Sequence, residues 1–139
     1  MVIVAAILAV LAAIAIPRLS RGSRGASDAA LEADLVALQE AIDSFAAQHD
    51  GEFPSADGIA NQLTQYTDRW GQAQARKDTS HIYGPYLRAI PPLPVGPRRG
   101  NTKIGPRDSD GVGWIYTAAS GQIEANVGEG GTSTTGAGP

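Results

Sequence analysis

The sequence predicts an α+β protein in which a long N-terminal α-helix packs on a small antiparallel β-sheet with extended loops. Three observations carry this prediction: a charge-free apolar run at Met1–Ile16, a one-sided apolar stripe between residues 27 and 49, and alternating apolar residues near the C-terminus. The stripe has the period of a helix, and the alternation has the period of a strand. We therefore expect a helix with an apolar first half and an amphipathic second half, followed by strands.

The apolar run has no polar face, so it needs lipid or other apolar helices on every side. As a helix it would extend roughly 24 Å, which is shorter than the hydrocarbon core of a membrane, about 30 Å thick and spanned by about 20 residues. Its frequent alanines favour close packing between helices. Pro17 removes a backbone donor, and Gly22 and Gly25 weaken the helix further, so we expect a Pro/Gly break in the segment of residues 1–25.

The globular domain is expected over residues 26–127. The apolar stripe predicts an amphipathic helix over residues 27–49, ended by Asp50-Gly51. We expect five side chains to pack this helix on the domain, although the same spacing also fits a coiled-coil seam: Leu31, Leu35, Leu38, Ile42 and Phe45. Ser55 is expected to cap a short helix near residues 55–66.

The remaining elements are a hairpin and loops. Trp114-Ile-Tyr116 and Ile123–Val127 alternate on either side of a Gly-containing turn, which predicts a hairpin over residues 112–127. Thr67–Ser80 and Val95–Gly111 are expected to be loops because they are polar or rich in glycine. Residues 128–139 are rich in Gly and Thr and predict a flexible tail.

Composition excludes several classes of function. The net charge of the 139 residues is −3 and no basic stripe is visible, so we expect no nucleic-acid partner. Cysteine is absent, which excludes disulfides and Cys-based sites. His49 and His81 lack a nucleophile partner or metal-ligand spacing, so we expect no enzyme and no catalytic residues. Asp108 and Asp110 are weak calcium candidates, because the rest of a calcium loop is missing; the alternative is a solvated turn.

Several segments resemble the type IV pilins and the type II secretion major pseudopilins. The apolar run ending in Leu11–Pro17, followed by a polar stretch and an amphipathic helix, is similar to the N-terminus of that family. His49–Pro54 resembles the turn after the family's long helix. Gly84–Leu87 with Pro91-Pro92, and Gly113–Asn126, resemble segments of its globular domain. The absence of cysteine favours the pseudopilin-like branch.

The resemblance implies a pilin-like fold and a structural subunit that polymerises through its N-terminal helix into a pilus-like or pseudopilus filament. The subunit is expected in the inner membrane before assembly, and afterwards in an extracellular filament or a periplasmic pseudopilus. The implied partners are further copies in a head-to-tail helical homopolymer, an inner-membrane assembly platform and a prepilin peptidase. The assembly core would contain Val4, Ile7, Leu8, Leu11, Ile14 and Pro17.

The family's leader peptide and first mature residues, including a glutamate, do not precede the apolar run here. We expect an N-terminus that is incomplete in this numbering, with a methylated phenylalanine upstream of Met1; a misassigned start and a leaderless protein are the alternatives. A function of another class also remains open: an exported soluble binding domain whose signal peptide is cleaved after Ala15. Trp70 and Trp114 are expected to anchor the core or a subunit interface. Acidic residues of the helix and Arg98, Arg99 and Arg107 could pair between subunits.

Overall fold

The computed structural model describes residues 22–128, and within the long helix it describes the side chains from Gly25 onward. The expected assembly-core residues, from Val4 to Pro17, therefore lie outside the described residues. Residues 129–139, the expected flexible tail, also lie outside them. Among the described residues, no helix combines the length and the apolar character needed to cross a membrane.

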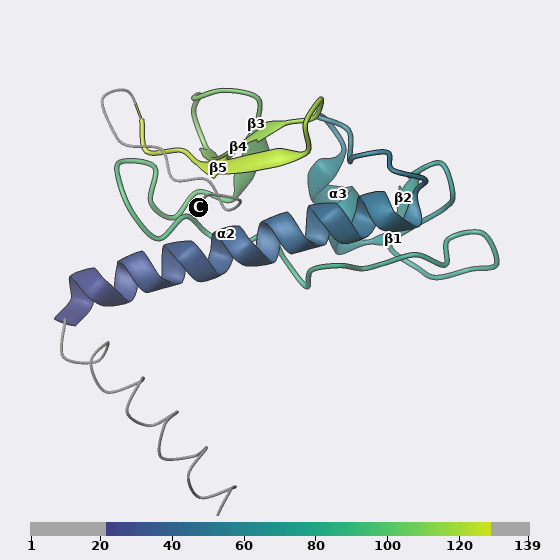
Figure 1. The fold of residues 1–139 in the computed structure, drawn as a ribbon, viewed down its shortest axis with the longest axis horizontal. Coiled ribbons are helices and arrows are strands. Elements are labelled where there is room, and N and C mark those ends of the chain that lie inside the picture. Colours follow the sequence, from purple (N-terminus) through teal and green to yellow (C-terminus); the bar gives the residue numbers. More distant parts are fainter. Residues whose placement is uncertain (1–21, 129–139) are drawn as a thin grey trace, which may run out of the picture.

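The chain forms two helices and two small sheets over the described residues (Figure 1). The helices are α2 (Gly22–Gln48) and α3 (Ile59–Thr64). One antiparallel sheet pairs β1 (Tyr66–Thr67) with β2 (Ala73–Gln74), and a second sheet has the strand order β3-β4-β5. Its strands are β3 (Lys103–Gly105), β4 (Val112–Thr117) and β5 (Gln122–Ala125). The α+β class expected from the sequence is confirmed.

Helix α2 is 27 residues long, or roughly 40 Å at 1.5 Å per residue. It begins at Gly22, earlier than the expected start at residue 27, and it continues through Gly25. Asp50 (φ 57°) and Gly51 (φ 84°) adopt left-handed conformations directly after it. The Gly51 N–H donates to the Ala46 carbonyl at 2.8 Å. This contact satisfies an orphan carbonyl of the last turn and turns the chain away, as the Asp50-Gly51 pair predicts.

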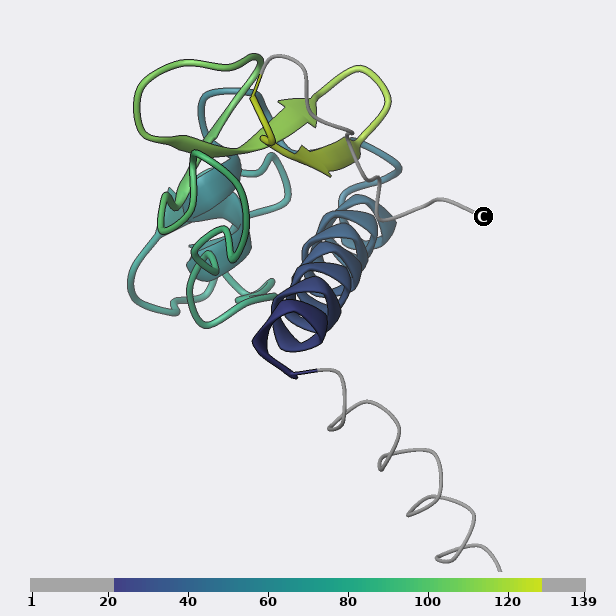
Figure 2. The same ribbon diagram turned by 90° about the vertical axis from the view of Figure 1, so that its left-hand side faces the viewer.

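The apolar face of α2 lies against the second sheet, with α3 beside it (Figure 2). The five side chains expected to pack the helix on the domain are all buried, with exposed fractions between 0% and 8%. They join a cluster that includes Trp114 from β4, Ile123 from β5 and Leu63 from α3. The burial of this face is what attaches the helix to the sheet, because an isolated helix gains most of its stability in proteins from such packing.

The expected hairpin is present, but the sheet is mixed rather than antiparallel. β4 and β5 pair antiparallel, with Trp114 opposite Ala125 and Thr117 opposite Gln122. β3 pairs parallel to β4, with a register shift between Lys103 and Ile104. The expected loop over Val95–Gly111 therefore contains a strand. β3 has only three residues and one buried side chain, Ile104, so the sequence shows no alternation there. Its pairing with β4 is set by tertiary packing.

Two further expectations need correction. The short helix begins at Ile59 and not after Ser55, whose hydroxyl instead accepts from the Gly58 N–H at 3.0 Å. Within the expected loop at Thr67–Ser80, β2 lies antiparallel to β1, and Thr67 also forms a bridge with Tyr83. Strands of two residues are too short to show a period in the sequence, so these pairings are invisible to pattern analysis.

The hairpin turn is held to α2 from two directions. The Gln39 amide donates to the Gly121 carbonyl at 2.8 Å and accepts from the Ile123 N–H at 3.3 Å. Gly121 has φ 69°, and a Cβ at this position would collide with the ring of Phe53. A glycine is therefore required here twice, by the backbone conformation and by the close approach of the chain that follows α2.

We expect truncation of the buried face of α2 to unfold the domain far more readily than truncation of the opposite face. Leu38→Ala and Ile42→Ala should each lower the free energy of unfolding by about 2–5 kcal/mol, because both side chains are fully buried. Val36→Ala is the matched control, since Val36 lies on the same helix and is 47% exposed. Urea unfolding followed by tryptophan fluorescence measures the difference; equal losses in all three variants would contradict this packing.

Candidate functional site

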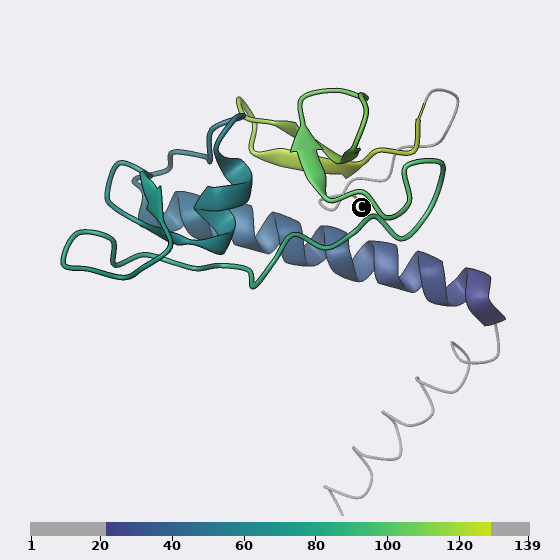
Figure 3. The same cartoon turned by 180° about the vertical axis from the view of Figure 1, so that it is seen from behind.

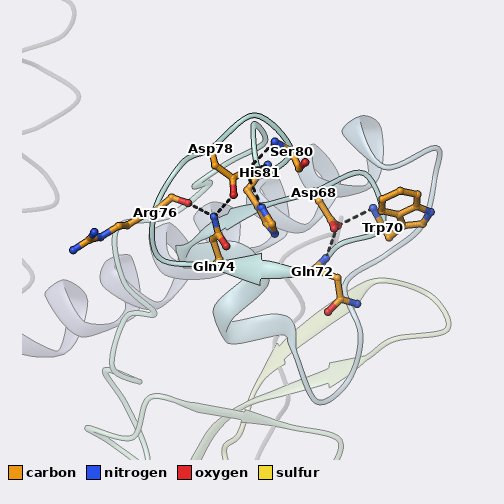
Figure 4. A network of polar contacts seen from close by, with 8 residues as sticks. All are labelled: Asp68, Trp70, Gln72, Gln74, Arg76, Asp78, Ser80 and His81. Carbon is orange, nitrogen blue, oxygen red and sulfur yellow. Dashed lines mark hydrogen bonds and ion pairs between the residues drawn. The ribbon is translucent and has the colours of Figure 1, made fainter.

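A tight turn between β1 and β2 presents the most exposed large apolar side chain of the described residues. We call residues 68–72 the tryptophan tip. The Asp68 carboxylate accepts from the N–H groups of Trp70 at 2.9 Å and Gln72 at 2.8 Å. The Gly71 N–H donates to the Asp68 carbonyl at 3.0 Å. These bonds fix the turn and leave the indole pointing away from the other labelled residues (Figure 4).

His49 anchors the tip to the end of α2. Its ring is 4% exposed and stacks on Phe45 with ring centroids 3.8 Å apart. Nδ1 lies 2.7 Å from the Phe45 carbonyl oxygen. Nε2 lies 3.0 Å from the Asp68 carbonyl oxygen and 3.1 Å from the Thr67 hydroxyl. Both ring nitrogens are thus engaged inside the fold, which gives His49 a structural role at the base of the tip.

The tip stands beside a hollow of about 410 Å³. Trp70 is 75% exposed and Phe53 is 37% exposed, and both line the hollow. The Arg69 guanidinium lies 5.2 Å from the centroid of the indole. The polar part of the lining carries both charges and is formed by His49, Asp50, Glu52, Ser55, Gln62 and Arg69. Such a surface can bind a partner through aromatic contact and ion pairing.

The two tryptophans have different roles. Trp114 is fully buried in the core, and its indole N–H donates to the Pro91 carbonyl at 2.8 Å. Trp70 is 75% exposed, so the core role is wrong for it and the interface role stays a prediction. The sequence signal for the tip is the Asp-x-Trp-Gly order, in which Asp and Gly favour a tight turn. The exposure of the indole was not evident from that signal.

The loop after β2 is organised by Asp78 (Figure 4). Its carboxylate accepts from the N–H groups of Ser80 at 2.8 Å and His81 at 2.7 Å, and from the Gln74 amide at 2.7 Å. The His81 ring nitrogen lies 3.0 Å away. These contacts, the His81 backbone bond first, hold the pKa of Asp78 well below its usual range. Asp78 therefore shapes the loop, and His81 serves as one of its partners.

The calcium candidates Asp108 and Asp110 both form ion pairs with Arg98. Arg98 Nε donates to the Asp108 carboxylate at 2.9 Å, and an Arg98 terminal nitrogen lies 3.8 Å from Asp110. The buried Asn126 amide donates to the same Asp108 oxygen at 2.8 Å and to the Val112 carbonyl at 2.8 Å. The Asn126 bond, followed by that of Arg98, lowers the pKa of Asp108.

A guanidinium thus occupies the place where a metal ion would compensate these carboxylates. Over residues 22–128, no three His, Cys, Asp or Glu side chains gather in a way that could hold a metal ion. Asp108 already accepts two hydrogen bonds on one oxygen, and Asp110 extends into solvent. The donor set does not fit calcium, which takes six to eight oxygen ligands. The structure instead gives Asp108 the role of clamping the loop at Arg98 to β5 through Asn126.

Comparison of the chain with protein-family models, with curated proteins and with solved structures finds no match.

The pH dependence of stability should report the Asp108 clamp. Because the folded-state pKa of Asp108 is lowered, its contribution is present above about pH 4 and is lost as the pH falls through the folded-state pKa. Asp108→Asn should therefore lower stability at pH 7 and make the loss of stability below pH 4 shallower. Asp110→Asn, whose carboxylate is solvent-exposed, is the matched control. Unfolding curves at several pH values measure both effects, and identical pH profiles for wild type and Asp108→Asn would contradict the clamp.

Calcium should leave the melting temperature unchanged, since Arg98 already supplies the positive charge between the two aspartates. The measurement is thermal unfolding of the intact chain in EDTA and in millimolar calcium. Magnesium at the same ionic strength controls for general salt effects. A saturable increase in melting temperature with calcium alone would show that Arg98 gives way to the ion.

Proposed function

We propose that the chain is a structural subunit that polymerises through its N-terminal helix into a type IV pilus-like or pseudopilus filament. The observation that carries the proposal is the apolar run at Met1–Ile16, which is joined through a short polar stretch to a helix that begins a folded domain at Gly22. The resemblance of the sequence to pilins and major pseudopilins gives this arrangement its meaning.

The energetics favour burial of the run in a partner. Nine large aliphatic side chains in Met1–Ile16 would contribute on the order of 20 kcal/mol if all were buried. The described domain fills its own core with α2, α3 and the second sheet. The run must therefore find its apolar surroundings in lipid, or among the same segments of other copies. Exchange of lipid for neighbouring helices lets a membrane-stored subunit enter a filament with little loss of apolar burial.

The described domain also suits a role in assembly rather than catalysis. Both histidines act within the fold, and the exposed features are an aromatic tip and charged surfaces. Inner-membrane storage, an assembly platform, a prepilin peptidase and a filament outside the membrane are all part of this proposal. A head-to-tail contact that does not close on itself would generate the filament.

Electron microscopy of sheared cell-surface material, labelled with an antibody against the domain, should detect filaments that contain this chain. Leu8→Asp should abolish them, because a carboxylate in an apolar helix bundle is strongly disfavoured. Leu8→Ile is the matched control and should assemble. Urea unfolding of the described domain should be the same in both variants as in the wild type, since Leu8 lies outside residues 22–128.

Mass spectrometry of the mature N-terminus distinguishes the competing function. A methylated residue upstream of Met1 supports the filament subunit. A mature chain that begins at Ile16, without labelled filaments, would instead support the exported soluble binding domain and overturn this proposal.

A further inference from the structure

Charges of opposite sign are segregated along the chain. Residues 25–68 contain Asp and Glu but no Lys or Arg, whereas Asp78 is the sole carboxylate within residues 69–107. Within the described residues, His81 pairs with Asp78, and Arg98 pairs with Asp108 and Asp110. Asp34, Arg69 and Arg99 belong to none of these ion pairs.

The tryptophan tip carries one half of a complementary surface. The indole of Trp70 is held out by a turn that is already fixed, so little conformational entropy is lost when it binds. Arg69 lies on the indole, and Asp50 and Glu52 line the same hollow. Tryptophan and arginine are among the residues most enriched as binding anchors in protein interfaces.

The second part of the complementary surface is a groove along the first half of α2. Its volume is about 500 Å³, and it runs between α2 and the proline segment Pro91–Pro94. Ala26, Ala30 and Asp34 line it from the helix, and Arg99 also belongs to the lining. Burial raises the pKa of Asp34, and no cation among the described residues lies in ion-pair contact with it. A partly desolvated carboxylate beside a proline-lined groove is suited to receive a cation next to an aromatic ring.

The tip and the groove lie toward opposite ends of the domain (Figures 1 and 3). β1 and β2, which flank the tip, lie at the C-terminal end of α2, and the chain around residues 91–100 lies beside its first half. A contact between the tip of one copy and the groove of another uses two different surfaces. Such a heterologous contact leaves a free tip and a free groove at the ends, so it repeats instead of closing into a two-fold dimer.

We propose that the tryptophan tip of one copy docks into the proline-lined groove of a second copy of this chain. The Trp70 indole packs on the prolines, Arg69 pairs with Asp34, and Asp50 and Glu52 face Arg99. This contact deepens the proposed filament function and rests on it, because it assigns the surfaces through which neighbouring domains meet. The charge pairs fix the register of the docking, while the buried indole supplies most of the affinity.

Cysteine cross-linking tests the contact, because the native chain has no cysteine to give background. Gln72→Cys places a thiol near the indole, and Ala30→Cys places one in the groove; both native side chains are exposed. The full-length double variant, oxidised under assembly conditions, should give a ladder of cross-linked oligomers. A mixture of the two single variants should stop at dimers. Efficient dimer formation by either single variant alone would overturn the contact in favour of a two-fold interface.

The anchor residues are then varied in the double-cysteine background. Trp70→Ala should reduce the cross-linked ladder roughly thirtyfold, the loss typical of a buried anchor, whereas Ile82→Ala at another exposed apolar position should not. Arg69→Asp and Asp34→Arg should each reduce it, and together they should restore it. Arg76→Asp, on the same basic segment, is the control for net charge. Failure of the double charge swap to restore the ladder would refute the Arg69–Asp34 pair.

Electron microscopy of the same samples separates this contact from the proposed function. Filaments with no ladder would overturn the docking and leave the filament function standing. A ladder without filaments would support the docking and overturn the filament function. The absence of both would overturn both proposals.

Discussion

The fold depends above all on the burial of one face of α2 against the hairpin of β4 and β5. Leu35, Leu38 and Ile42 are buried in a cluster with side chains of this hairpin and of α3, and a two-stranded hairpin needs such packing because it is marginally stable alone. The helix likewise needs the sheet, because its apolar stripe would otherwise face water. Each element is therefore stable only in the presence of the other, and the loops between them are placed by that contact. Figure 3 shows how much of the chain runs as loop around this pair.

The loops are held by polar side chains rather than by regular structure. Asp68, Asp78 and Asp108 each accept several hydrogen bonds and each fixes one stretch of irregular chain. Asn126 and His49, both buried, link two of these stretches to β5 and to α2. A domain with little strand content and no disulfide thus obtains its order from fully satisfied polar contacts; no buried side-chain nitrogen or oxygen of the described residues is left without a partner. The tryptophan tip is held by contacts of the same kind.

The elements whose signals are local could be predicted from the sequence, whereas the elements set by distant contacts could not. The period of Leu31 to Phe45 and the Asp50-Gly51 stop predicted α2, and the alternation around Gly121 predicted the hairpin. β3 was missed because a single buried side chain, Ile104, has no period, and its parallel pairing depends on β4. For the candidate site, sequence alone could name Trp70 as a core or interface anchor. It could not choose between them, because the choice depends on the Asp68 turn and on what packs beside it. The pairing of Arg98 with Asp108 was not predictable for the same reason, since the two residues meet only in the folded chain.

The contact between α2 and β5 joins the two ends of the described chain, and this has a consequence for biosynthesis. Of the described elements, α2 is synthesised first and β5 (Gln122–Ala125) last. Until then the apolar stripe of α2 has no sheet to cover it, and the nascent chain must keep that surface from aggregating. A translation product that stops before β5 contains the complete helix but lacks the strand that covers part of its apolar face. The packing of α2 is therefore completed only once β5 has been synthesised.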